Sequence, residues 1–107
     1  MPINGARERA LQIVRGILAG DIQVLEAVIA LCPLVRSDPT IATKEDAHLI
    51  IALESEIDHL PIGGVRGEWH PDILPEKDQE IARFEKLSSE DVRSACERIL
   101  TRISALQ

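Results

Sequence analysis

The feature that most constrains the fold is an apolar stripe that keeps one helical phase through the last third of the chain. At about 100° per residue the stripe is roughly 100° wide, and it contains Leu74, Ile81, Phe84, Ser88, Val92, Ala95, Ile99, Ile103 and Leu106. The pair Ser88-Ser89 would suit a helix start, but a new helix has no reason to keep the old phase. The pattern therefore favours one long helix of about 30 residues over two helices separated at Ser88. Pro71 and Pro75 each suit a first helical turn, so the helix should begin near one of them.

The first third of the chain has the pattern of two short helices. Gly20 is suited to ending the first helix, Asp21 to capping the second, and Pro33 to limiting it. Helices joined so closely should form an antiparallel or steeply crossed pair. Apolar residues recur at helical spacing in both helices: Ala6, Ala10, Ile13, Val14, Ile17 and Leu18 in the first, and Ile22, Leu25, Val28, Ile29 and Cys32 in the second.

A third helix should start at Thr43, with Asp46 placed to reciprocate the cap. Its apolar residues between 47 and 53 form a nearly continuous run, which indicates burial on more than one side. The helix should end at or before Leu60, because Pro61 disfavours a helical conformation in the residue before it. The glycines that follow mark an irregular loop: Gly63, Gly64 and Gly67.

These patterns predict a single all-α domain, residues 1–107, of four or five helices: a short N-terminal helix pair, a buried third helix, a Gly/Pro-rich loop and a long C-terminal helix. The chain has 107 residues, of which 45% are apolar, enough for one core. Trp69 and Phe84 are the only aromatic residues, so the core should be almost entirely aliphatic. Cys32 and Cys96 lie in apolar helical surroundings without a CxxC motif, which favours two reduced core thiols over a disulfide or a reactive site.

The net charge of −6 disfavours nucleic acid as a partner, because nucleic-acid binders need a surplus of Lys and Arg or rows of stacking rings. No apolar run approaches the roughly 18 residues of a membrane span, and the N-terminus lacks the order of a signal peptide. The expected location is therefore the cytoplasm. The charge favours basic partners or cations.

The whole of the net charge lies in the middle third, residues 37–72, which holds two Lys or Arg against eight Asp or Glu. Glu54, Glu56 and Asp58 crowd the end of the third helix, where the helix dipole already presents negative charge. A cation should offset them, and the nearest candidate is Arg66, whose guanidinium can bridge carboxylates. The leading hypothesis is thus a structural clasp, in which Arg66 binds these carboxylates while Trp69 fills the core.

A more specific alternative is that the same segment forms a metal or catalytic site. Glu54, Asp58, His59 and His70 are the candidate ligands of a metal-assisted hydrolase, because divalent metals combine carboxylate and imidazole groups. The spacing matches no established metal motif, and neither Ser nor Cys has the setting of a nucleophile. We expect no cofactor and favour a non-enzymatic protein.

The third hypothesis is a recognition surface, on which the acidic residues face a basic protein partner and Trp69 serves as an anchor. Trp and Arg are favoured at binding hot spots, and acidic patches speed association with basic targets. An immunity or antitoxin-like role is one concrete version. The length of the C-terminal helix also permits a homodimer that packs these helices together. The acidic residues are Glu54, Glu56, Asp58, Glu68 and Asp72.

One more pattern lies mainly in residues 54–96, and it consists of the segment from Glu54 to Pro61, of Gly64, Arg66 and Trp69, of Lys77-Asp78, Glu80-Ile81 and Glu85, and of Val92 and Ala95-Cys96. In these residues the chain resembles a family of small bacterial proteins without an assigned activity. The resemblance implies a soluble bacterial domain whose loop around Arg66 and Trp69 forms a unit with the start of the last helix. It transfers no catalytic residue.

Overall fold

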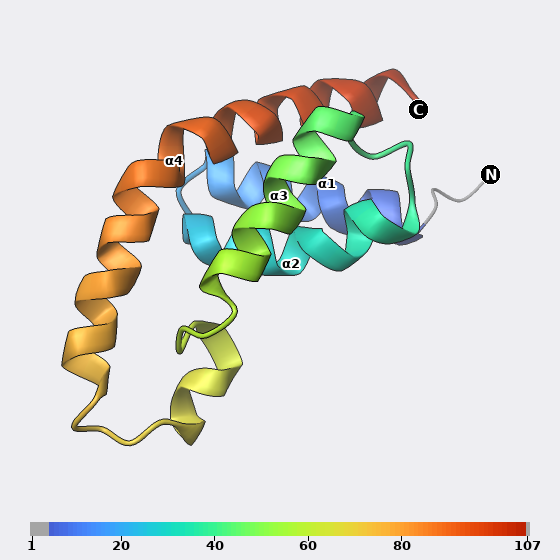
Figure 1. Cartoon of the computed structure of the whole chain (residues 1–107). Coiled ribbons are helices and arrows are strands. Elements are labelled where there is room, and N and C mark those ends of the chain that lie inside the picture. Colours follow the sequence, from blue (N-terminus) through green and yellow to red (C-terminus); the bar gives the residue numbers. More distant parts are fainter. Residues whose placement is uncertain (1–4, 107) are drawn as a thin grey trace.

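The computed structural model describes residues 5–106 and confirms the all-α prediction. The helices are α1 (Gly5–Leu18), α2 (Val24–Ser37), α3 (Lys44–Ile57), the 3₁₀ helix η1 (Gly63–Glu68) and α4 (Leu74–Ala105), as Figure 1 shows. The part of the chain that the structure describes contains no strand. None of these helices combines the length and the hydropathy needed to cross a membrane.

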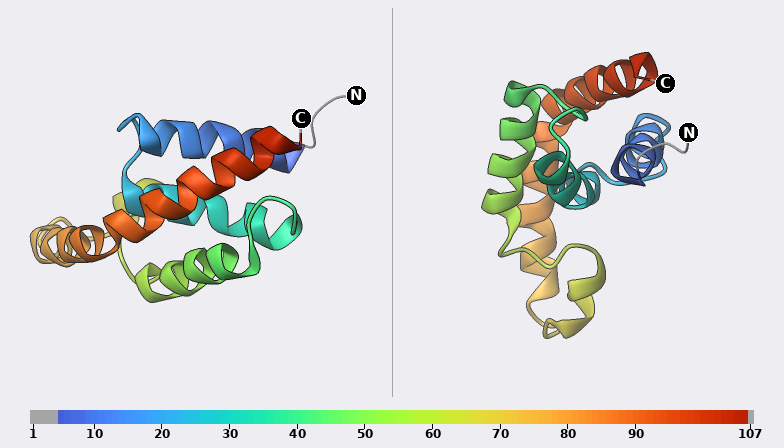
Figure 2. Two further views of the ribbon diagram at one scale, coloured as in Figure 1. Left: turned by 90° about the horizontal axis from the view of Figure 1, so that it is seen from above. Right: turned by 90° about the vertical axis from the view of Figure 1, so that its right-hand side faces the viewer.

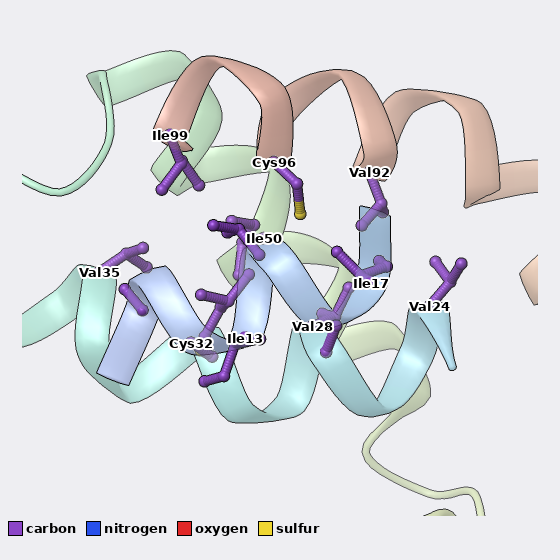
Figure 3. Packing of buried hydrophobic residues seen from close by; sticks show 14 of the residues in the cluster. Ile13, Ile17, Val24, Val28, Cys32, Val35, Ile50, Val92, Cys96 and Ile99 are labelled. Carbon is purple, nitrogen blue, oxygen red and sulfur yellow. The ribbon is translucent and has the colours of Figure 1, made fainter. Parts of the chain in front are cut away.

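The packed body is built around α2, which lies between α1 and α3, while the second half of α4 crosses over them (Figure 2). Side chains from all four helices meet in the interior, among them Ile17, Val28, Ile50 and Ile99 (Figure 3). The buried core residues between positions 5 and 106 are Ala, Val, Leu, Ile and Cys. The core is therefore aliphatic, as the scarcity of aromatic residues predicts.

Gly20 ends α1 as expected, in a left-handed conformation with φ of 83°. Glycine adopts this conformation without the steric penalty that a Cβ brings. The predicted role of Asp21 as the cap of α2 is wrong. The backbone N–H groups of Asp21 and Ile22 donate to the Gly16 carbonyl, at 2.8 and 3.3 Å, so both residues belong to the turn that closes α1, and α2 begins only after Gln23.

The expectation that Pro33 limits the second helix is also wrong, because α2 continues through it to Ser37. Proline removes one N–H donor and leaves the carbonyl four residues earlier without its helical partner. Both Pro33 and Ile29, which supplies that carbonyl, are exposed, so water can satisfy the carbonyl and the helix tolerates the interruption.

The connection from α2 to α3 is fixed by polar contacts. The Asp38 carboxylate, only 8% exposed, accepts hydrogen bonds at Oδ1 from the backbone N–H and the hydroxyl of Thr40, at 2.9 and 2.5 Å. These bonds, with the nearby charge of Arg7, lower the pKa of Asp38. Arg7 donates to the Thr40 hydroxyl at 2.9 Å and Arg102 to the Thr40 carbonyl at 2.8 Å. The connection is thereby held to both α1 and α4.

Thr43 caps α3 as predicted, since its hydroxyl accepts the Asp46 backbone N–H at 3.1 Å. The Asp46 carboxylate does not reciprocate the cap. It is buried and receives three N–H···O contacts of 2.9 to 3.1 Å from Arg98 of α4. The burial on more than one side expected for this helix is not observed, because α3 buries one face, with Ile50 in the core, and leaves Ala52 exposed.

The long C-terminal helix is confirmed: α4 runs unbroken for 32 residues and has Pro75 in its first turn. It is not straight, since Figure 1 shows that it changes direction about midway. The Ser88 hydroxyl donates to the Phe84 carbonyl at 2.6 Å, a bond that competes with the helical ladder and often bends helices. Ser88 thus lies near the middle of one continuous helix that bends.

The bend separates α4 into two different environments. Its buried residues begin at Val92, and from Gly63 to Asp91 not one residue is buried. We call residues 63–91, which comprise η1, the following loop and the first half of α4, the arm. Figures 1 and 2 show the arm extending away from the packed body, and the described chain accordingly measures 49 × 24 × 23 Å.

Candidate interaction surface

Arg66 forms a clasp, but not with the predicted carboxylates. Its two terminal nitrogens donate to the two oxygens of Asp78, at 2.6 and 2.8 Å, and one of them also reaches the Pro61 carbonyl at 3.4 Å. The expected pairing with Glu54, Glu56 or Asp58 is therefore wrong. The hydrogen bonds raise the pKa of Arg66 and lower the pKa of Asp78. The contact fastens η1 to the first half of α4, within the arm.

The carboxylates at the end of α3 are left without a cation. Glu54 accepts a weak hydrogen bond from the Cys32 thiol, with 3.8 Å between sulfur and oxygen. Glu56 and Asp58 are exposed, and within residues 5–106 neither forms a hydrogen bond or ion pair through its carboxylate. The last turn of α3 also has no basic residue. Solvent, instead of Arg66, surrounds Glu56 and Asp58.

Trp69 does not fill the core. It directly follows η1 in the loop that leads to α4, is half-buried, and lies outside the cluster of core residues and the apolar residues packed against it. Its backbone N–H donates to the Arg66 carbonyl at 3.2 Å. The single tryptophan therefore belongs to the partly exposed surface of the arm.

The candidate metal ligands do not converge, because Asp58 faces solvent and the other three have separate partners. His59 contacts Glu80 of α4 at 2.9 Å, and this contact is the largest cause of the lowered pKa of Glu80. His70 accepts the Asp72 backbone N–H at 3.2 Å, while Glu54 faces Cys32 as described above. No three His, Cys, Asp or Glu side chains between residues 5 and 106 converge as a metal site would require.

The arm and the body enclose a cleft of about 470 Å³. One wall is the start of α2, the second is the segment from Pro61 to Arg66, and the third is the face of α4 that carries Asp78, Ile81, Ala82 and Glu85. These four positions follow helical spacing, so they lie on one side of α4. The lining combines charged side chains with the apolar side chains of Leu25, Ile62 and Ile81.

Negative charge exceeds positive charge in this cleft. Its charged residues are Glu26 of α2, Asp78 and Glu85 of α4, and Arg66. Arg66 and Asp78 satisfy each other. Glu26 and Glu85 form no hydrogen bond or ion pair through their carboxylates with any described residue. The cleft therefore has two uncompensated carboxylates.

A second hollow, of about 590 Å³, lies between the start of α3 and the second half of α4. Its charges balance, because Asp46 and Glu97 stand against Arg98 and Arg102. Asp46 is 5% exposed and already accepts three hydrogen bonds from Arg98. This contact joins α3 to α4, and the hollow has no excess charge to offer a ligand.

Sequence reasoning missed Glu26, Asp78 and Glu85 as site residues. The regular spacing of Asp78 and Glu85 along α4 could have indicated a shared face, but mixed charges on a helix usually belong to a solvated surface. Glu26 gives no such signal, because its place in the cleft depends on how the start of α2 meets the arm.

The fold and the surface together define an all-α protein with a compact body and a protruding acidic arm. Comparison with known proteins finds no matching family model, no matching curated protein and no matching solved structure. The resemblance of residues 54–96 to small bacterial proteins therefore stays a prediction.

Proposed function

We propose that this chain is a non-enzymatic protein-interaction module whose arm binds a basic protein partner. The distribution of charge carries the proposal. The arm, residues 63–91, holds eight Asp or Glu against four Lys or Arg, a net charge of −4 out of −6 for the whole chain, and the adjoining residues 54–62 add three more acids and no Lys or Arg. A protein with its charge concentrated on one projecting segment attracts oppositely charged partners to that segment.

Exposed apolar side chains on the arm support a protein, rather than a small ion, as the partner. Leu87 is 81% exposed, Val65 47% and Ile73 42%, and all three lie on the arm. Protein interfaces combine such apolar contacts with a charged rim. Trp69, which is half-buried and also on the arm, is of a type enriched at binding hot spots.

The same charge argues against an arm-to-arm homodimer, because two acidic arms would repel each other. In the second half of α4, moreover, the apolar stripe is covered within the chain by the other helices. We therefore favour a different, basic protein over a second copy. An immunity or antitoxin-like role, in which a small acidic protein neutralises a basic toxin, is one concrete form of the proposal.

The proposal describes a soluble bacterial protein of the cytoplasm. Cys32 and Cys96 support this location, because both are free and buried, as is usual in proteins from reducing compartments. A metal-assisted hydrolase using Glu54, Asp58 and a histidine gains no support from the contacts of those residues.

Site-specific photo-crosslinking tests the proposal. A benzoylphenylalanine at position 87 of the arm should crosslink, in the source cell, to a protein with a basic surface. The same group at position 12, where exposed Gln12 lies on α1 of the body, is the control and should not capture that protein. Crosslinks to the same proteins from both positions, or none from position 87, would contradict the proposal.

A further inference from the structure

We propose that the cleft between α2 and the arm binds an arginine side chain of the basic partner. This inference rests on the proposed function and deepens it, since it names the contact at which the partner is recognised. The occupant is an arginine presented by a protein segment that lies along the acidic arm.

The shape of the cleft fits a long side chain with a charged end. Its volume of about 470 Å³ lies within the range of ligand pockets. Leu25, Ile62 and Ile81 line it; the half-buried Ile81 offers most of the apolar surface, since Leu25 and Ile62 are core residues, 1% and 7% exposed. Arginine buries its aliphatic stem on such surface and keeps its guanidinium among polar groups.

The charges of the cleft select a cation. Arg66 is occupied by Asp78, with both terminal nitrogens bonded, and it gives the cleft no free positive charge. Glu26 and Glu85 remain unpaired within the described chain and together supply the excess of two negative charges. An acidic occupant would meet both of them, whereas a cationic one supplies the partner that they lack.

Arginine suits these carboxylates better than lysine does. The guanidinium is planar and has five N–H donors, so it can serve two carboxylates and a backbone carbonyl at once. The cleft already shows this mode of binding, because Arg66 contacts both oxygens of Asp78 and the Pro61 carbonyl. A lysine ammonium is a single point charge on a flexible stem.

Nuclear magnetic resonance titration with a short probe tests the inference on the full chain. The probe is the blocked tripeptide acetyl-Gly-Arg-Gly-amide, and its control is the same peptide with citrulline, which has nearly the shape of arginine but no charge. The arginine peptide should shift the backbone amides of residues 23–26, 62–66 and 78–85. The citrulline peptide should bind at least about tenfold more weakly, because a charge-assisted bond is lost.

Variants then assign the binding to the two carboxylates. Glu26→Gln and Glu85→Gln should each weaken binding of the arginine peptide about threefold, since solvent screens these partly exposed charges. Glu90→Gln is the matched control. It removes the same charge from the arm but lies outside the cleft lining, and it should change the affinity less than twofold. Amide spectra of the free variants verify that each keeps the fold.

The outcomes separate this inference from the proposed function. If the arginine peptide shifts residues along the whole arm and Glu90→Gln weakens it as much as the cleft variants do, the cleft inference is overturned while a basic partner for the arm still stands. Equal binding of the arginine and citrulline peptides, or no shifts in the cleft, also overturns the inference. Crosslinking from position 87 tests the proposed function independently of all these results.

Discussion

Truncation of a large apolar side chain should lower the free energy of unfolding strongly in the second half of α4 and only slightly in its first half. Ile99 lies in the second half and is fully buried, whereas Leu87 lies in the arm and is 81% exposed. Substitution of either residue by alanine removes three carbon atoms. The environment of the side chain is therefore the main difference between the two variants.

The expected magnitudes follow from burial. Three buried carbons are worth about 2.4 kcal/mol at roughly 0.8 kcal/mol each, and the cavity left behind brings the cost of Ile99→Ala to about 3 to 4 kcal/mol. Only about a fifth of the surface of Leu87 is buried, so Leu87→Ala should lower the free energy of unfolding by about 0.5 kcal/mol or less. Urea unfolding followed by circular dichroism at 222 nm measures both free energies by linear extrapolation.

Two results would refute this reasoning. A loss of less than about 1 kcal/mol in Ile99→Ala would mean that the second half of α4 does not lie in the core as described. A loss above about 1.5 kcal/mol in Leu87→Ala would mean that the arm is covered. If that loss depended on protein concentration, the cover would be a second copy of the chain, and the preference for a different, basic partner would fall.

Two further predictions concern titratable groups. The pKa of Asp38 is lowered in the folded state, so its contribution to stability is present above the unfolded pKa and is lost as pH falls through the folded one. Acid unfolding curves should therefore show stability declining below about pH 4, and Asp38→Asn should flatten that decline; an unchanged pH slope would contradict the role of the Thr40 contacts. Burial raises the pKa of the Cys96 thiol to about 11. Ellman's reagent at pH 8 should therefore react with Cys96 only after urea unfolds the chain. Rapid reaction of this thiol in the native protein would show that it is not buried.

The sequence was most informative where structure depends on local spacing. The constant phase of the stripe predicted α4 as one helix, because phase is a property of the helix itself. The Thr43 cap and the Gly20 turn likewise need only residues a few positions apart. The bend in α4 escaped prediction, because it depends on whether the Ser88 hydroxyl turns inward to the backbone or outward to water.

The site was harder to predict, because its contacts join distant parts of the chain. Closeness in sequence favoured Glu54, Glu56 or Asp58 as the partner of Arg66. The observed partner, Asp78, lies near Arg66 because the chain turns back after η1 and enters α4. The prediction that Pro33 limits α2 is wrong for a related reason. Its effect depends on whether the freed carbonyl meets solvent, and no local pattern reveals this.

The unbroken backbone of α4 has a kinetic consequence for binding. The arm is joined to the body by a continuous helix, and it is therefore preformed before any partner arrives. A preformed surface loses little conformational freedom on association, and no folding step delays the encounter. Together with its charge, this favours a rapid, salt-sensitive association rate. Under the proposed function, such an arm would capture a basic partner quickly.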